Sequence, residues 1–212
     1  MARRTKIMNA EIPSNLYAPA STALSPIPSG AGFGIRFGAR LIDTIYGSFL
    51  GLAVGFISGI VFAILSKLGK ITPEWPQLIN QHPFSGFGLG ILGAFLYHAF
   101  SEGIGSLTIG KLICGLRVVQ MDGRPATMKG ALIRDLAYHL DALFFGLIGY
   151  MSMKQGPLSQ RYGDVWGKTV VVKTSVFQPR PLRNEWQMLG GIALGSFLWG
   201  GTLFLQMLMK VM

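Results

Sequence analysis

Residues 41–65 read LIDTIYGSFLGLAVGFISGIVFAIL, a run of 25 residues in which Asp43 is the only charged side chain. A helix of this length spans the hydrocarbon core of a bilayer with some tilt. Residues 84–100 and 188–208 form two further apolar runs, and neither contains Asp, Glu, Lys or Arg. The sequence therefore predicts an all-α polytopic membrane protein.

The composition supports this class. Half of the 212 residues are hydrophobic and 13% are charged, about half the charged fraction of a typical soluble domain. This excludes a disordered chain and argues against a soluble enzyme. The net charge is +10, and the basic residues lie between the apolar runs, which favours contact with anionic lipids at the cytoplasmic face over nucleic-acid binding. Cys114 is the single cysteine, so no intrachain disulfide can form.

Lysine and arginine counts predict the orientation. Residues 1–40 hold five, 66–83 two, 101–130 four and 152–187 six. If residues 131–153 also crossed the membrane, the loop with six would share a side with the loop with two, against the positive-inside rule. We therefore expect a cytoplasmic N-terminus, three full transmembrane helices, and residues 131–153 as a re-entrant or interfacial helical segment. Four crossings remain the alternative.

Two short β-branched runs lie outside the apolar segments. They are LRVVQ at residues 116–120 and TVVVK at residues 169–173, each flanked by turn residues. We expect them to pair as a small cytoplasmic, hairpin-like β element, which requires both flanking loops on the same side of the membrane.

Residues 35–43 and 133–141 share the pattern I-R-x-x-A-x-x-x-D. On a helix, the Arg and Asp of one copy lie about 10.5 Å apart along the axis, too far for an intrahelical pair. We therefore expect the arginine of one copy, Arg36 or Arg134, to meet the aspartate of the other, Asp141 or Asp43. Chance similarity combined with ordinary anchoring at the membrane boundary is the alternative.

At these residues the sequence resembles the RDD family of bacterial membrane proteins, named for one arginine and two aspartates. The stretch RFGARLID at residues 36–43, TIGK at 108–111, GLRVV at 115–119, DGRP at 122–125 and QRYGD at 160–164 followed by GKTVVV at 167–172 all fit, in order. The resemblance implies Arg36 as the signature arginine, with Arg40 as a competitor, and Asp43 and Asp141 as the aspartates. It also implies that some members exchange monovalent cations for protons.

Composition, the apolar runs and the resemblance together predict four parts of the chain. We expect a flexible Pro- and Ser-rich cytoplasmic tail over residues 1–32, an RDD-like membrane domain over 33–173, a linker over 174–187, and an additional C-terminal transmembrane helix over 188–212, beyond the usual end of the domain.

Asp43 and Asp141 are the first candidates for chemistry, because an ionisable residue in a membrane segment is costly. They either exchange ions, with Arg36 or Arg134 tuning their pKa, or form structural ion pairs. The loop motif Gln160, Arg161, Gly163 and Asp164 is either a gate or partner-binding turn, or a capped turn in which Asp164 accepts backbone N–H groups and Arg161 pairs with an acid.

Glycines recur every fourth residue on the first span, and such a face lets another backbone approach closely. The occupant is either a foreign helix or the second span of the same chain. The last span carries a similar pair. The residues concerned are Gly47, Gly51, Gly55, Gly59, Gly191 and Gly195.

We expect a non-catalytic, multi-pass protein of the bacterial inner membrane, without cofactor or metal. The favoured function is that of an accessory subunit, which docks by its glycine-faced helices onto other transmembrane subunits of a larger complex. The alternative is a monovalent cation/proton antiporter that uses Asp43 and Asp141.

Overall fold

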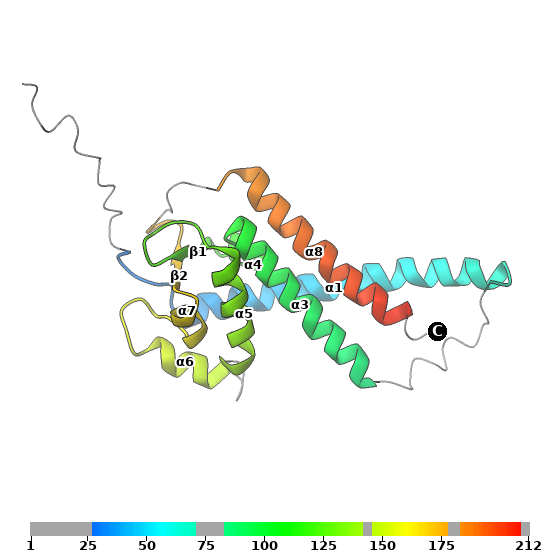
Figure 1. Cartoon of the computed structure of the whole chain (residues 1–212), viewed down its shortest axis with the longest axis horizontal. Helices are drawn as coiled ribbons and strands as arrows, with labels where there is room; N and C mark the ends of the chain where they lie inside the picture. Colours follow the sequence, from blue (N-terminus) through cyan, green and yellow to red (C-terminus); the bar gives the residue numbers. More distant parts are fainter. Residues whose placement is uncertain (1–26, 71–82, 142–145, 178–182, 209–212) are drawn as a thin grey trace, which may run out of the picture.

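The computed structural model describes residues 27–70, 83–141, 146–177 and 183–208. Three long helices and a compact group of short elements make up the fold (Figure 1). We call residues 108–141 and 146–177 the headpiece. The long helices are α1 (Phe33–Lys67), α3 (Pro83–Gly105) and α8 (Glu185–Leu208); the headpiece holds α4 (Ile109–Ile113), β1 (Leu116–Gln120), α5 (Met128–Asp141), α6 (Leu147–Met153), α7 (Tyr162–Trp166) and β2 (Thr169–Lys173).

Two of the described helices are long and apolar enough to cross a bilayer, over Phe33–Lys67 and Glu185–Gln206. Few of their residues are buried, and large apolar side chains are exposed, with Phe56 at 72% and Phe197 at 75%. A soluble protein would bury such helices, whereas lipid would cover them in a membrane. The chain is therefore a membrane protein. The predicted second span lies on α3, whose 23 residues reach about 35 Å; three full crossings remain a proposal.

The helices α3 and α8 run antiparallel, and their backbones approach closely through small residues. A Cβ added at Gly191 would lie 2.9 Å from the Gly105 nitrogen, and one at Gly195 would lie 2.8 Å from the Tyr97 carbonyl oxygen. The Ser101 hydroxyl also donates to the Gly191 carbonyl oxygen, at 3.3 Å. Gly191 and Gly195 thus serve packing within this chain.

The glycine face of α1 is also used internally over its first part. A Cβ added at Gly47 would overlap the Trp199 ring of α8, and one added at Gly51 would lie 3.8 Å from Leu203 Cδ1. The Tyr46 hydroxyl joins the same pair of helices by donating to Ser196 Oγ, at 2.7 Å. The groove predicted for a foreign helix, or for the second span, is occupied here by α8. Farther along the same face, nothing lies within 4 Å of a Cβ added at Gly59.

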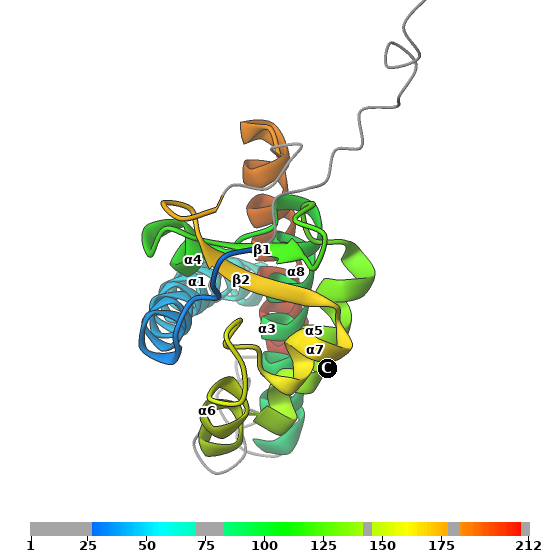
Figure 2. The same ribbon diagram turned by 90° about the vertical axis from the view of Figure 1, so that its left-hand side faces the viewer.

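Residues 131–153 do not form one continuous helix. The 14 residues of α5 and the seven of α6 are separate, and Gly146, the N-cap of α6, adopts the left-handed conformation at φ 81°. Each helix is much shorter than the roughly 20 residues that a span needs. Figure 2 shows α5, α6 and α7 gathered beside the sheet.

The two predicted strands pair, as expected, in antiparallel register from Leu116 opposite Lys173 to Gln120 opposite Thr169. They are not a hairpin, because α5, α6 and α7 lie between them in the sequence. Both faces of the sheet are buried, one under Ala31 and Ala39, the other under Phe177. Burial on two faces explains why the strands read as continuous apolar runs without alternation.

Candidate functional site

Asp43 is the third residue of the apolar run, yet it is only 1% exposed, and both of its carboxylate oxygens accept hydrogen bonds. Oδ1 accepts from the Gly110 backbone N–H at 2.7 Å and from the Tyr97 hydroxyl at 3.1 Å, and Oδ2 accepts from the Thr108 hydroxyl at 2.7 Å. The carboxylate therefore joins α1 to α3 and to the first turn of α4. A Cβ at Gly110 would overlap the Ala39 carbonyl oxygen, so only glycine permits this approach.

The second aspartate of this region is Asp164, on α7, whose side chain is fully buried. Arg36 Nη1 of α1 donates to Oδ2 at 2.6 Å, and Arg134 Nη2 of α5 lies 3.4 Å from Oδ1. Burial by itself would raise the pKa of Asp164, but the Arg36 and Arg134 guanidinium groups hold it well below its usual range. Asp164 also accepts the Arg161 backbone N–H at 3.1 Å, as expected for a capped turn.

The ion pairs of Arg36 and Arg134 with Asp164 form a cluster, and a further carboxylate, Glu102 near the end of α3, extends it. Its Oε1 accepts from Lys111 Nζ at 2.6 Å, and its Oε2 lies 3.4 Å from Arg134 Nε. Arg134, 2% exposed, therefore lies between Glu102 and Asp164, and these two carboxylates raise the pKa of Arg134 against the effect of burial. The ion pairs connect α1, α3, α4, α5 and α7 at one end of the molecule.

Arg40 and Arg161 lie against the ring of Tyr138. The guanidinium carbon of Arg40 is 3.9 Å from the ring centroid, and that of Arg161 is 5.3 Å from it. Arg40 also pairs with Asp135 at 3.5 Å. Arg161 was expected to pair with an acid, but among the described residues it has no ion pair within 4 Å.

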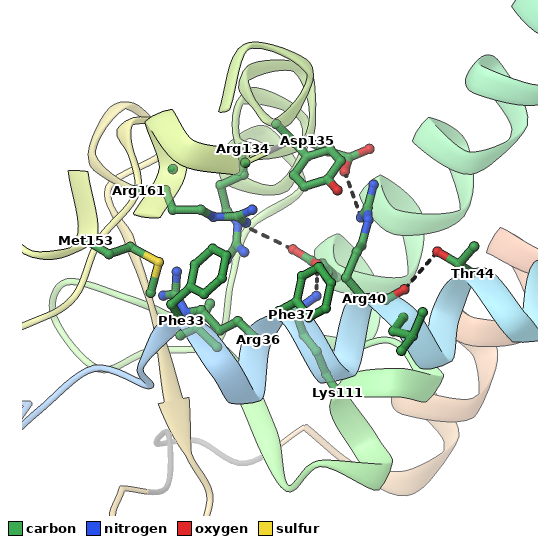
Figure 3. Close-up of a pocket in the computed structure, with 16 residues that line it drawn as sticks. Phe33, Arg36, Phe37, Arg40, Thr44, Lys111, Arg134, Asp135, Met153 and Arg161 are labelled. Carbon is green, nitrogen blue, oxygen red and sulfur yellow. Dashed lines mark hydrogen bonds and ion pairs between the residues drawn. The ribbon is translucent and has the colours of Figure 1, made fainter. Parts of the chain in front are cut away.

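A cavity of about 460 Å³ opens beside this cluster, between the start of α1 and helices α5 and α6 (Figure 3). Five cationic side chains line it, from three helices and the turn before α7. Two carboxylates, Glu102 and Asp135, line it as well. Apolar side chains complete the wall. The cations are Arg36, Arg40, Lys111, Arg134 and Arg161, and the main apolar residues are Phe33, Phe37, Leu41, Tyr138 and Met153.

Several guanidinium nitrogens at this cavity are buried without a hydrogen-bond partner among the described residues. They are Nε and Nη2 of Arg36, Nε and Nη1 of Arg134, and Nε of Arg161. Buried donors are usually paired, because an unpaired one costs about 1–3 kcal/mol. Of these, Arg134 Nε still lies within ion-pair distance of Glu102, at 3.4 Å. No group of three metal-ligating side chains occurs in the part of the chain that the structure describes.

The expected pairing between the two copies of the repeat is wrong for Arg134 and Asp43. Arg134 pairs with Glu102 and Asp164, whereas Asp43 binds hydroxyl and amide donors. Arg36 pairs with Asp164 of the loop motif. The side chain of Asp141, which ends α5, lies outside the described residues. Gln160 donates to the Thr169 carbonyl oxygen at 2.7 Å and so holds the loop to β2.

Sequence reasoning missed Glu102, Asp135 and Tyr97. Glu102 could have been found from its position, because it is the first acidic residue after the apolar run at 84–100. Gly163 is explained by packing: a Cβ there would lie 2.9 Å from the Arg134 carbonyl oxygen, so α7 can approach α5 only without a side chain.

Arg36, Lys111 and Asp164 of the cluster, the close-packed Gly110 and Gly163, and most residues of the paired strands come from the motifs quoted above. A comparison with protein families agrees with this geometry, since the model of the RDD family matches residues 30–168. The chain belongs to the RDD family. Neither a curated protein nor a solved structure matches it. In this RDD protein, the matched region contains both Arg36 and Asp164, which meet in the cluster.

Proposed function

We propose that this RDD protein is a non-catalytic accessory subunit, which docks on another transmembrane subunit through the second half of α1. One observation carries the proposal: this half runs on past α3 and α8 and presents exposed apolar side chains (Figure 1). Phe49, Leu52, Phe56, Ile60 and Ile64 follow one another at intervals of three or four residues and are 47–72% exposed. They form one face of the helix.

The same half of α1 contains an unfilled notch. Nothing lies within 4 Å of a Cβ added at Gly59, whereas the corresponding space at Gly47 is filled by Trp199. Small residues flanked by large ones let a second helix approach closely in lipid, where packing and not the hydrophobic effect drives association. An occupant with a transmembrane helix fits this surface. The charge pattern favours a cytoplasmic headpiece and N-terminus in a bacterial inner membrane.

The test is purification from native membranes in mild detergent at native expression level, with composition read by mass spectrometry. We expect a stoichiometric complex with at least one other membrane protein. Gly59→Leu fills the notch without an internal clash, so it should release the partner while the protein still inserts. Gly201→Leu is the matched control, because Gly201 also has open space and lies on α8. A chain that runs alone, or a partner retained by Gly59→Leu, would refute the proposal.

Monovalent cation/proton exchange is a second candidate, and one observation favours it. A cavity of about 320 Å³ lies between α1, α3 and α8, and Asp43, Ser48 and His98 line it. Asp43 and His98 are both ionisable, and ionisable side chains at a cavity between membrane helices mark candidate ion paths. Against this, both oxygens of Asp43 already bind donors. Cation-driven proton flux in proteoliposomes, lost on Asp43→Asn with the fold retained, would establish exchange; absence of flux in the wild type would exclude it.

A further inference from the structure

We propose that the cavity at the start of α1 binds the phosphate of an anionic phospholipid, with the lipid tail leaving along the apolar surface of α1. This inference concerns a different surface from the docking face of α1 and stands independently of the accessory role. It rests on the charge of the cavity, its unpartnered donors and the nature of its opening.

The charge of the cavity favours an anion. Five cations line it, and three carboxylates, Glu102, Asp135 and the adjacent Asp164, neutralise part of that charge, which leaves an excess of two positive charges. Each carboxylate already has a cationic partner within 4 Å. Arg161 is the one lining cation without an ion pair among the described residues, and its guanidinium group is held in place over Tyr138.

The unpartnered donors fit a phosphate in particular. The Arg36 and Arg134 side chains are 8% and 2% exposed, yet each keeps two nitrogens without a hydrogen-bond partner. Planar guanidinium groups bind phosphate oxygens through paired N–H donors, and a buried bond of this kind is roughly twice as strong as a neutral one. The side chains of Arg134, Arg161 and Arg36 come together around the cavity in Figure 3.

The opening of the cavity favours an amphiphile over free phosphate. Phe37 and Leu41 line it and are 59% and 51% exposed on α1, the helix that continues into the membrane. Leu147 and Met151 of α6 are exposed as well, although they do not line the cavity. Exposed apolar side chains at the edge of a cationic cavity would contact an acyl chain. Free phosphate would leave them in water.

The experiment measures lipid binding to the full chain in dodecyl maltoside by native mass spectrometry. The probes are dioleoyl phosphatidylglycerol, dioleoyl phosphatidylcholine and inorganic phosphate as a competitor. We expect one phosphatidylglycerol to bind about tenfold more tightly than phosphatidylcholine, because the choline cation opposes the charge of the site. Millimolar inorganic phosphate should not displace it. Displacement of the lipid by phosphate would assign the site to a free oxyanion and overturn the lipid assignment.

Variants locate the bound lipid. Arg161→Gln removes a cation without leaving a carboxylate unpaired, so it should weaken phosphatidylglycerol binding about tenfold, while Arg161→Lys should recover part of the affinity. Arg124→Gln is the matched control on the exposed surface. Phe37→Ala tests the tail path on a side chain too exposed to be needed for folding, with Phe197→Ala as its control. Wild-type affinity in both Arg161→Gln and Phe37→Ala would overturn the proposal.

Discussion

At the scale of single residues, three buried carboxylates connect several elements of the fold. Asp43, Glu102 and Asp164 are each at most 4% exposed, and each binds groups from at least two other elements. A buried charge is tolerated only when it is paired and hydrogen-bonded. These side chains therefore have a structural role that does not require them to carry ions.

Asp43→Asn should destabilise the protein by about 1–3 kcal/mol, because one acceptor becomes a donor and the charge-assisted bonds to Thr108 and Gly110 weaken. The measurement is the free energy of unfolding in mixed micelles. Asp122→Asn, at an exposed aspartate, is the matched control and should change it by less than about 0.5 kcal/mol. Unchanged stability in Asp43→Asn would contradict a structural role.

Asp135 should make stability depend on pH. Burial raises the pKa of Asp135 to about 6, although Arg40 opposes the shift; Glu102, Lys111 and His139 also face it. Because the pKa of Asp135 is higher in the folded state, protonation of this side chain stabilises the fold. The stabilisation is complete below about pH 4, the pKa of an aspartate in the unfolded chain, and is lost as the pH rises through 6. Its size is about 3 kcal/mol. Unfolding measured from pH 4 to 7 should show this loss in the wild type and not in Asp135→Asn; parallel profiles would contradict the shift.

At the scale of elements, close backbone approach through glycine recurs. Gly110 sets α4 against α1, Gly163 sets α7 against α5, and Gly191 and Gly195 set α8 against α3. In lipid, such contacts allow dispersion forces to hold helices together without a hydrophobic driving force.

Gly195→Leu should separate α3 from α8, because the new side chain would collide with the Tyr97 backbone and Ser101. We expect a large fall in the thermal midpoint, corresponding to about 2–4 kcal/mol. Gly190→Leu, on the same helix with nothing within 4 Å of a Cβ, is the control and should melt like the wild type. Equal midpoints for the two variants would contradict the packing described.

Local pattern predicted the elements better than their partners. The strands at 116–120 and 169–173 and the helices at the first and last spans follow from apolar runs and β-branched residues, and the structure confirms them. The Arg36–Asp164 pair could not be predicted, because these residues lie 128 positions apart and no periodicity connects them. The similarity of the two Arg–Asp repeats predicted an ion pair between Arg134 and Asp43 as one option. In the structure these two side chains have other partners.

At the scale of the whole molecule, the headpiece lies at one end of α1, and the second half of α1 reaches away from it (Figure 1). If α1 crosses the bilayer, the headpiece and Lys67 lie on opposite sides. The charge counts predict which side each faces, since basic residues concentrate on the headpiece side.

Cysteine labelling tests this arrangement. With Cys114 replaced by serine, Lys129→Cys on the headpiece should react with an impermeant maleimide only after the membrane is opened. Lys67→Cys should react in intact cells or spheroplasts. Both parent side chains are exposed, so accessibility in the fold is matched. Labelling of both positions from one side would contradict a transmembrane α1.

The central claim is that Arg36, the arginine of the RDD signature, joins α1 to a structural cluster in the headpiece, in which Arg36 and Asp164 are one buried ion pair. A double-mutant cycle with Arg36→Gln, Asp164→Asn and their combination, read as free energies of unfolding, tests it most directly. Asp164→Asn leaves the buried Arg36 without its carboxylate partner, so this loss should be large, about 3–5 kcal/mol. Arg36→Gln should cost less, because Arg134 still lies 3.4 Å from Asp164. The double variant should lose at least about 1.4 kcal/mol less than the sum of the single losses. Additive losses within about 0.5 kcal/mol would show that the two residues do not interact and would contradict the claim.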